Sequence, residues 1–421
     1  MADDMSDIIP CEIARKIAVE HLDNLDDVES LSLVCSSWRS ETSDINYTNF
    51  FPSKNTQLPW LMLADSPSSL FRRFYNLSKR MFLKIDIPPF EHDLNHNLNH
   101  NHDHDHRRFF SSKGWVITVT RKQALISFFD PFTTTLIKPP SIPILCFQRG
   151  QSWNNRSYLH SFSKFIFSDN ARSSSSSSSS DFQVAVIYDI YEHIAFWRSG
   201  QQQWMKPTFE VNNIEDVCFF KGEFYSIDYR SEVIAYGSEL PTSLPRTIAY
   251  LDSVGIESCS CVILKTWFYI VPFNQNESTL LIVQRKMCNK PNKDDMSNIN
   301  TNNNNPKRWW VESISLIELN VDNGETKLID NIGNRALFVG LNSTFFVEVE
   351  DEAFSGKDKR CCRANSIYFT DGKFGGNHRR AGETDLRIFC LKEGKMVEPY
   401  YEGPSRYNCV NPPVWVELPH Q

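Results

Sequence analysis

The first twenty residues carry apolar side chains at helical spacing. Ile9, Ile13 and Ile17 recur every four residues, which places them on one face of a helix. Pro10 stands near the start of this helix, where the missing backbone N–H costs nothing. A helical unit of about forty residues is too short to enclose a large core. Part of its apolar face must therefore be covered by another surface.

A second helix is predicted from about Asp26. Glu29 follows three residues later, as in an acidic capping box. Apolar residues then continue at helical spacing: Val28, Leu31, Val34, Cys35 and Trp38. Together these patterns predict a small all-α unit of three helices over residues 5–48.

From about residue 58 the pattern changes to short runs rich in β-branched and aromatic residues. Examples are "GWVITV", "FQVAVIYD" and "TWFYIVPF", each separated from the next run by turn residues. Long amphipathic helical patterns are nearly absent from this part of the sequence. The pattern predicts a large all-β domain over residues 58–418.

The predicted strands recur in groups. Comparable positions follow one another at intervals of about 50 residues, with one longer interval that contains a polar insertion. These positions are Leu61, Trp115, Phe165, Val217, Phe268 and Leu337. A repeat of this length with about four strands is typical of a kelch-like β-propeller, here of about six blades. A large β-sandwich is the rival interpretation, and the length of the domain makes it the weaker one.

Three low-complexity segments interrupt the predicted domain, at 91–108, 171–181 and 289–308. They are rich in His, Ser and Asn, respectively, and cannot bury apolar surface, so loops between strands are expected. The first holds six of the eleven His residues of the chain. Imidazole is a good ligand for transition metals, but the segment has no defined ligand spacing. A repeat-expanded loop is the favoured interpretation, and no metal site is predicted.

Composition and charge narrow the function classes. The chain has 421 residues, 41% of them hydrophobic, and a formal net charge of −7. No basic stripe is visible, so binding to nucleic acid is not expected. No secretory signal and no apolar run long enough to span a membrane is recognisable. The eleven Cys residues are scattered, which favours reduced thiols in the nucleus or the cytoplasm.

The N-terminal segment "IPCEIARKI…HLDNLDDVESLSLVCSSWRS" resembles the F-box. The matching positions are Ile9-Pro10, Glu12, Asp26 or Asp27, Val34-Cys35 and Trp38-Arg39. The segment departs from the motif in having Ile9 in place of Leu and in having Cys11. Ile for Leu conserves volume and is usually mild.

This resemblance implies that the apolar face binds the Skp-type adaptor of a cullin–RING ubiquitin ligase. The candidate adaptor-binding residues are Ile9, Pro10, Ile13, Ile17, Leu31, Val34, Cys35 and Trp38. Some of them must also pack the helices on one another, and the sequence does not separate these two roles. Trp38 is of the type that often dominates interface energy.

The C-terminal third carries a second resemblance. "NSIYFTD", the hairpin "FCLKEGKM", the pair Tyr400-Tyr401 and "PPVWVELP" look like the end of plant F-box proteins. In these proteins an F-box precedes a β-rich domain catalogued as domain-of-unknown-function family 295. Skp-interacting-partner and kelch-like plant F-box proteins are similar in kind. The two resemblances together cover most of the chain.

No catalytic constellation is recognisable in the sequence. It contains no G-x-S-x-G, no H-E-x-x-H and no P-loop. Cys259-x-Cys261 and Cys361-Cys362 lack the spacing of a structural zinc site. We therefore expect a non-enzyme without catalytic residues and without a cofactor.

The resemblances imply the substrate-recognition subunit of an SCF-type (Skp–cullin–F-box) ubiquitin ligase. Its expected partners are a Skp-type adaptor, a cullin held through that adaptor, and an unidentified target protein. Two alternatives stay open. One is a propeller enzyme or ligand-binding protein in which the helices are only a structural cap. The other is an F-box scaffold that binds the adaptor but no cullin.

Overall fold

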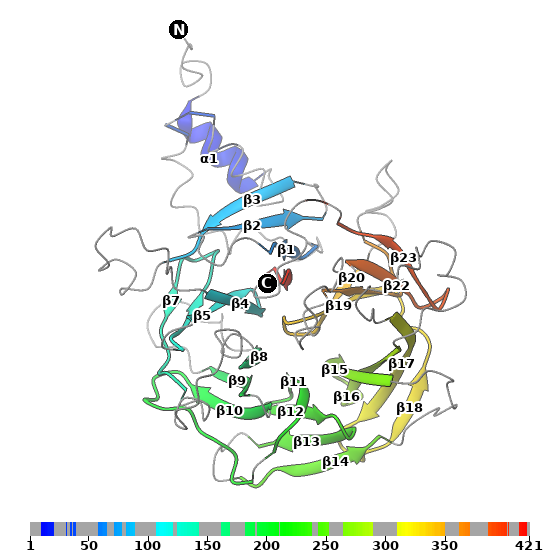
Figure 1. Ribbon diagram of the computed structural model, residues 1–421. Helices are drawn as coiled ribbons and strands as arrows, with labels where there is room; N and C mark the ends of the chain where they lie inside the picture. Colours follow the sequence, from blue (N-terminus) through cyan, green and yellow to red (C-terminus); the bar gives the residue numbers. More distant parts are fainter. Residues whose placement is uncertain are drawn as a thin grey trace, which may run out of the picture.

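The computed structural model is a six-bladed β-propeller (Figure 1). The structure describes residues 10–20, 31, 34–35, 37–38, 58–64, 71–77, 81–88, 107–120, 124–142, 161–168, 182–189, 192–209, 211–237, 243–251, 264–288, 310–349, 362–370, 386–401, 403 and 412–418. Six separate sheets lie around a common axis, and each sheet forms one blade. Helix α1 (Cys11–Glu20) projects outside the ring in the view of Figure 1.

Blades 1 and 2 contain four strands each. Blade 1 has the order β24-β1-β2-β3, with β24 (Val414–Val416), β1 (Trp60–Met62), β2 (Phe71–Asn76) and β3 (Met81–Asp86). Blade 2 contains β4 (Arg107–Ser112), β5 (Trp115–Thr120), β6 (Ile126–Phe129) and β7 (Leu136–Ile137).

Blades 3 and 4 follow around the ring. Blade 3 contains β8 (Phe162–Phe167), β9 (Gln183–Tyr188) and β10 (His193–Arg198). An isolated antiparallel bridge between Phe196 and Met205 extends blade 3 beyond β10. Blade 4 contains β11 (Ile214–Phe220), β12 (Glu223–Asp228), β13 (Glu232–Tyr236) and β14 (Arg246–Tyr250).

Blades 5 and 6 complete the ring. Blade 5 contains the long strands β15 (Leu264–Asn274), β16 (Thr279–Cys288) and β17 (Trp310–Asn320), followed by β18 (Thr326–Ile329). Blade 6 has the order β20-β19-β21-β22-β23, with β19 (Arg335–Val339), β20 (Phe345–Glu348), β21 (Ser366–Phe369), β22 (Arg387–Cys390) and β23 (Lys395–Pro399). Strands β19 and β21 are parallel to each other.

The ring is closed by pairing between the two ends of the domain. Strand β24 pairs antiparallel with β1, and Val414 and Val416 stand opposite Met62 and Trp60. Blade 1 is therefore built from the first and the last strands of the propeller. Closure removes the open sheet edges that an incomplete ring would expose.

Alternate residues of an inner strand contribute to different cores. In β9, Val184 and Val186 belong to one buried cluster, whereas Ala185 and Ile187 belong to another. Successive side chains of a strand point to opposite faces, and each blade is covered by a neighbour on both faces. The central strands therefore need apolar residues at nearly every position.

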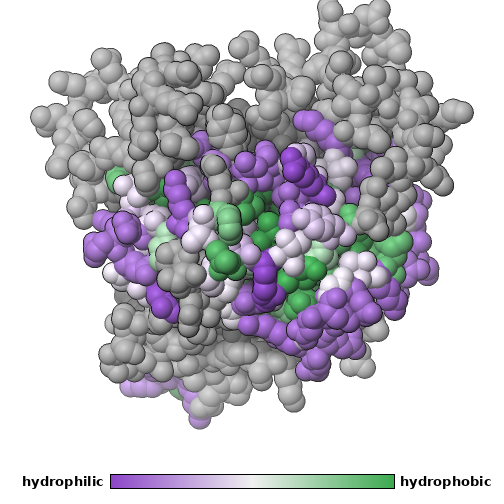
Figure 2. All heavy atoms as spheres, turned by 90° about the horizontal axis from the view of Figure 1, so that it is seen from below, coloured by the Kyte–Doolittle hydropathy of each residue, from purple (hydrophilic) through white to green (hydrophobic). Residues whose placement is uncertain are grey.

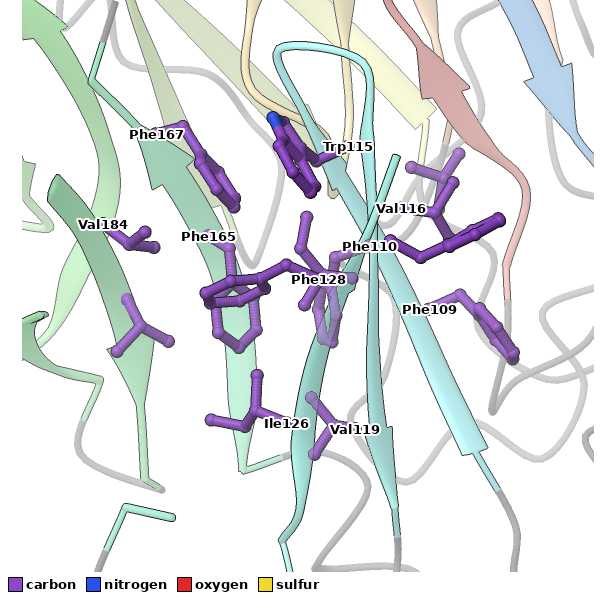
Figure 3. Close-up of a cluster of buried hydrophobic side chains, with 14 of the residues drawn as sticks. Phe109, Phe110, Trp115, Val116, Val119, Ile126, Phe128, Phe165, Phe167 and Val184 are labelled. Carbon is purple, nitrogen blue, oxygen red and sulfur yellow. The ribbon is translucent and has the colours of Figure 1, made fainter. Parts of the chain in front are cut away.

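Aromatic side chains fill the interface between blades 2 and 3 (Figure 3). The rings of Trp115 on β5 and Phe167 on β8 stack with centroids 5.7 Å apart. Phe128 on β6 meets Phe167 edge-on at 4.9 Å. Edge-on and offset pairs of this kind add to the stabilisation that burial alone provides.

Glycine-containing turns connect the inner hairpins. Lys221 and Gly222 have φ angles of 47° and 84° between β11 and β12. A two-residue hairpin of this type requires positive φ at both positions, and Gly adopts it without steric cost. The sequence "FKGEFYSID" therefore forms a strand, a turn and a second strand.

The spacing-based prediction of about six blades is confirmed. The six positions that defined the repeat lie in six different sheets. They are not equivalent: Phe165, Val217 and Phe268 lie on the first strand of a blade, whereas Leu61 and Trp115 lie on the second. The interval stays near 50 residues although the positions lie on different strands of their blades, because each strand is short and a shift by one strand changes the interval only a little.

The predicted loop boundary at 91–108 is wrong at its end. Arg107 and Arg108 begin β4, and both side chains are buried. The rest of that segment and residues 171–181 and 289–308 lie outside the described residues. For the predicted three-helix unit, the structure describes residues 10–20, 31, 34–35 and 37–38. Of these, α1, Leu31, Ser37 and Trp38 are helical, whereas Val34 and Cys35 are not.

The outer edges of the blades carry scattered apolar side chains among polar ones. Figure 2 views the rim from below Figure 1 and shows hydrophobic areas between larger hydrophilic ones. Leu244, Tyr250 and Leu328 are more than half exposed in this part of the protein. None of the described helices is long and apolar enough to cross a membrane.

Candidate functional site

Helix α1 presents part of its apolar face to solvent. Pro10 is exposed and accepts a hydrogen bond from the Ile13 backbone N–H at 3.0 Å. The side chain of Ile13 is 45% exposed, although it is large and apolar. Ile17 is half-buried on the same helix. Ile9 lies outside the described residues.

The second part of the predicted adaptor-binding set has a mixed environment. Val34 is 43% exposed, and its N–H donates to the Leu31 carbonyl oxygen at 3.2 Å. Leu31 is half-buried, and Cys35 is a half-buried free thiol. Trp38 is only 4% exposed.

The exposed fractions separate residues that are available to a partner from residues that pack within the chain, and the sequence alone could not separate these two roles. Ile13 and Val34 are accessible in the free chain, so a partner can cover them without rearrangement. Trp38 already packs within the chain, so its truncation would disturb folding as well as any interface. The adaptor-binding role of all eight residues stays a prediction.

The tip of the β19–β20 hairpin lies on the inner side of the ring (Figure 1). The tip residues Leu341, Asn342, Ser343 and Thr344 are all buried. The Ser343 N–H donates to the carbonyl oxygen of Ser111 in blade 2 at 3.0 Å. The tip of this blade 6 hairpin therefore contacts blade 2, which is two blades away around the ring.

A buried ion pair lies against this tip. The Lys164 ammonium of blade 3 is 2.5 Å from the Asp216 carboxylate of blade 4, and their side chains are 4% and 0% exposed. The Lys164 Nζ also donates to Thr344 Oγ1 at 3.2 Å. The Asp216 carboxylate accepts the backbone N–H groups of Ile270 and Val217.

This arrangement provides structural support on the inner side of the ring. The two charges neutralise each other, and both carboxylate oxygens of Asp216 have backbone donors. A catalytic or ligand-binding carboxylate would need access to a cavity, whereas this one is enclosed. The network joins blades 3, 4, 5 and 6.

Sequence reasoning missed Lys164, Asp216 and Thr344. They come from three different blades and are far apart in the chain. A Lys or Asp in a strand is ordinarily read as solvent-exposed, and no local pattern marks these as buried. Only the ring closure brings them together.

Trp197 and Trp204 have structural partners and do not form an open recognition surface. Trp197 is 4% exposed in the core between blades 2 and 3. Trp204 packs against that core, and its indole N–H donates to the Pro140 carbonyl oxygen at 2.7 Å. Trp310 begins β17, and Trp309 lies outside the described residues.

Among the described residues, no three His, Cys, Asp or Glu side chains come together in a way that could hold a metal ion. The His-rich segment up to residue 106 lies outside those residues. The described free cysteines are Cys35, Cys218, Cys362 and Cys390.

Comparison with known families identifies the propeller. The sequence profile described as KIB1-4 beta-propeller matches residues 74–390, from within β2 to the end of β22. The chain belongs to this family. The match covers the strands of all six blades except β1, β23 and β24.

A full-length relative comes from Arabidopsis thaliana. The protein named "Putative F-box protein At5g55150" is 23% identical over 392 residues, covering 92% of this chain and 91% of the relative. The chain is thus similar, along nearly its whole length, to a plant protein that is named as a putative F-box protein.

Two solved structures are similar at 10% identity. One is a protein of unknown function from Bacteroides caccae, with a TM-score of 0.38, and the other is a nidogen–laminin complex, with a TM-score of 0.41. Each match covers 86% of this chain and 100% of the other chain. Both scores are below 0.5, so neither likeness bears on function.

Proposed function

We propose that the protein is the substrate-recognition subunit of an SCF-type ubiquitin ligase. The observation that carries this proposal is the exposure of Ile13 and Val34 in the helical segment that precedes a six-bladed propeller. The resemblance of this segment to the F-box, and the name of the Arabidopsis relative, support the same assignment.

In this proposal the two parts of the chain have separate roles. The helical segment binds a Skp-type adaptor and through it a cullin, and the propeller binds a target protein. The subunit is not itself an enzyme, because it acts by holding the target near the conjugating enzyme. It acts in the nucleus, the cytoplasm or both.

The finer family assignment also belongs to this proposal. The pieces that resemble family 295 are "NSIYFTD", the "FCLKEGKM" hairpin, Tyr400-Tyr401 and "PPVWVELP". They contribute to β21, the β22–β23 hairpin, the core beside β24, and β24 itself. Their position in the closing part of the ring supports a plant, kelch-like F-box propeller.

A propeller enzyme or small-ligand binder is the alternative. It requires polar groups that converge on an accessible space at the axis. Among the described residues, Lys164 and Asp216 on the inner strands β8 and β11 are buried and paired with each other. This pairing favours the ligase-subunit proposal over the alternative.

Adaptor binding can be tested with the double variant Ile13→Glu, Val34→Glu. Each substitution places a charge where a half-exposed apolar side chain would become buried, so binding should weaken by at least tenfold. The measurement is retention of purified Skp-type adaptor and cullin on the immobilised full chain.

The matched control is the double variant Leu244→Glu, Leu328→Glu, which introduces the same two charges at more exposed apolar residues of the propeller. It should bind adaptor like the wild type. Wild-type adaptor capture by the double variant would contradict the proposal. Adaptor capture without cullin would instead favour the scaffold alternative.

A further inference from the structure

One end of blade 4 carries three large side chains that stand out into solvent, here called the blade 4 patch. Tyr229 and Arg230 lie in the turn between β12 and β13, and Tyr250 is the last residue of β14. Tyr229 is 50% exposed, Tyr250 is 67% exposed, and Arg230 is exposed as well. Tyr250 stands opposite Glu232, the first residue of β13, so the turn and the end of β14 lie at the same end of the blade. Figure 1 shows β13 and β14 on the outer side of the ring.

The backbone that carries the patch is held by hydrogen bonds. The Tyr229 N–H donates to the Asn213 carbonyl oxygen at 3.1 Å, and the Arg230 N–H donates to Asp228 Oδ1 at 2.9 Å. The same carboxylate oxygen accepts the Glu232 N–H at 2.8 Å. Asp228 is only 7% exposed, so its carboxylate serves to fix the turn.

The side chains of the patch are also held in place. Arg230 Nε donates to the Tyr229 hydroxyl oxygen at 2.7 Å, and the guanidinium lies 5.2 Å from the centroid of that ring. The Tyr250 hydroxyl donates to Glu232 Oε1 at 2.9 Å, and the Thr247 hydroxyl donates to the same oxygen at 2.7 Å. Side chains that are already ordered lose less conformational entropy when a partner binds.

The Arg230 guanidinium can accept a further partner. Among the described residues it forms no ion pair within 4 Å, and only its Nε is hydrogen-bonded. A guanidinium binds a carboxylate through two parallel N–H···O bonds, which fix both the distance and the direction of the partner. Arg230 can therefore receive a carboxylate from solvent without breaking an existing ion pair.

Two acidic residues of the chain lie near this cation. Asp228 and Glu232 are close enough to raise the pKa of Arg230, after the larger effect of its hydrogen bond to Tyr229. Neither pairs with Arg230 within 4 Å, because both carboxylates accept other donors. Salt screens their repulsion of an incoming anion, whereas a bound carboxylate would touch the guanidinium directly. A carboxylate alone would therefore bind weakly, and a tight ligand must gain further contacts.

The tyrosine rings provide these contacts. Tyr offers a large amphipathic surface at a small cost in conformational entropy, and Tyr and Arg are among the residue types that dominate interface energies. Tyr250 is the most exposed large side chain with apolar character among the described residues. An apolar side chain next to the bound carboxylate would bury part of this aromatic surface.

We propose that the blade 4 patch binds a segment of the target protein in which an Asp or Glu stands beside an aliphatic or aromatic residue. Arg230 binds the carboxylate, and the rings of Tyr229 and Tyr250 cover the apolar side chain. The inference rests on the proposed function, because it names the chemistry of the target that the propeller recognises.

The test uses the purified full chain, immobilised, and a phage library of random dodecapeptides. Peptides enriched on the wild type should contain an Asp or Glu next to an aliphatic or aromatic residue. One such peptide is then labelled with fluorescein, beside a copy in which every Asp is replaced by Asn and every Glu by Gln. Fluorescence anisotropy should detect weaker binding of the copy, and binding of the acidic peptide should weaken as salt is added. Enrichment of peptides without acidic residues, or of no peptide, would overturn the proposal.

Variants then locate the site. Arg230→Gln and Tyr250→Ala should each weaken binding of the acidic peptide by about fivefold or more, as expected for interface residues of this type. The matched control is Arg246→Gln, which removes a half-exposed Arg of the same blade that is already paired with Glu223. It should bind the peptide like the wild type. Unchanged binding by the Arg230→Gln, Tyr250→Ala double variant would overturn the proposal.

Tyr229 has a positioning role that can be measured separately. Tyr229→Phe keeps the ring but removes the acceptor that holds Arg230 Nε. It should weaken binding of the acidic peptide by about two- to tenfold, the range for one hydrogen bond, and leave binding of the Asn/Gln copy unchanged. Because the side chain is half exposed, the melting temperature should stay the same. An equal effect on both peptides would show that Tyr229 does not position the guanidinium.

Adaptor capture is measured on the same preparations. Loss of the predicted peptide binding with intact adaptor capture would refute the blade 4 patch alone. Peptide binding at the patch without adaptor capture would refute the ligase function and leave the patch standing as a binding site.

Discussion

The buried ion pair on the inner strands of the propeller gives the sharpest test of the fold. In Lys164→Met the Asp216 carboxylate stays in place, enclosed and without its counter-ion, with the donors Ile270 N–H, Val217 N–H and Thr344. At an effective dielectric constant of about 20, charges 2.5 Å apart attract each other by roughly 7 kcal/mol. Part of this attraction only offsets the desolvation of the two ions.

Removing one partner of such a pair typically costs about 3–5 kcal/mol, because an uncompensated charge stays buried. We expect this loss in the free energy of unfolding of Lys164→Met, measured by urea denaturation with tryptophan fluorescence. The double variant Lys164→Met, Asp216→Asn should recover part of the loss, since no isolated charge is left.

An exposed pair serves as the control. Arg246 and Glu223 form a salt bridge in blade 4, but the Arg246 side chain is 51% exposed. Arg246→Met should therefore cost no more than about 1 kcal/mol. A loss below about 1 kcal/mol in Lys164→Met, or an equal loss in both variants, would refute the reasoning.

Two further predictions concern a tyrosine and the closing strand. Burial, and then the nearby Glu223 carboxylate, raises the pKa of Tyr225 to about 12. As the pH rises, the unfolded chain therefore loses the Tyr225 hydroxyl proton before the folded chain does. The free energy of unfolding should fall between pH 10 and 12, and it should fall less in Tyr225→Phe. Parallel pH profiles of the wild type and Tyr225→Phe in urea titrations would contradict this. Trp415 is fully buried on β24 between Phe338 and Tyr400, with ring centroids 4.9 Å away, and Trp415→Ala should cost about 3–5 kcal/mol. An unchanged melting temperature would show that blade 1 closes without this contact.

Much of the propeller could be predicted because its strands are short and locally encoded. The alternation of faces in β9 requires apolar residues at nearly every position, and such runs are visible in the sequence. The interval of about 50 residues follows from four such strands and their turns. The position of each strand within its blade could not be predicted, because Leu61 has the same local pattern as Phe165.

Long-range features could not be predicted from local patterns. Arg107 and Arg108 follow a His-rich run, so the sequence predicts that they belong to the same loop. In the structure they begin β4, and both side chains are buried. Asp216 and Lys164 read as ordinary polar strand residues until the ring places them together. The exposures of Ile13 and Trp38 differ although both belong to the predicted adaptor-binding set.

Pairing of β24 with β1 also has a consequence for synthesis of the chain. Met62 pairs with Val414, so the edge of β1 stays without this partner until the segment that contains Val414 has been synthesised. At about 5–20 residues per second, this interval lasts roughly 20–70 s. During it the nascent chain presents an open sheet edge, which is a site for aggregation and for chaperone binding. A premature stop codon just before Val414 would leave every translated copy in that unclosed state.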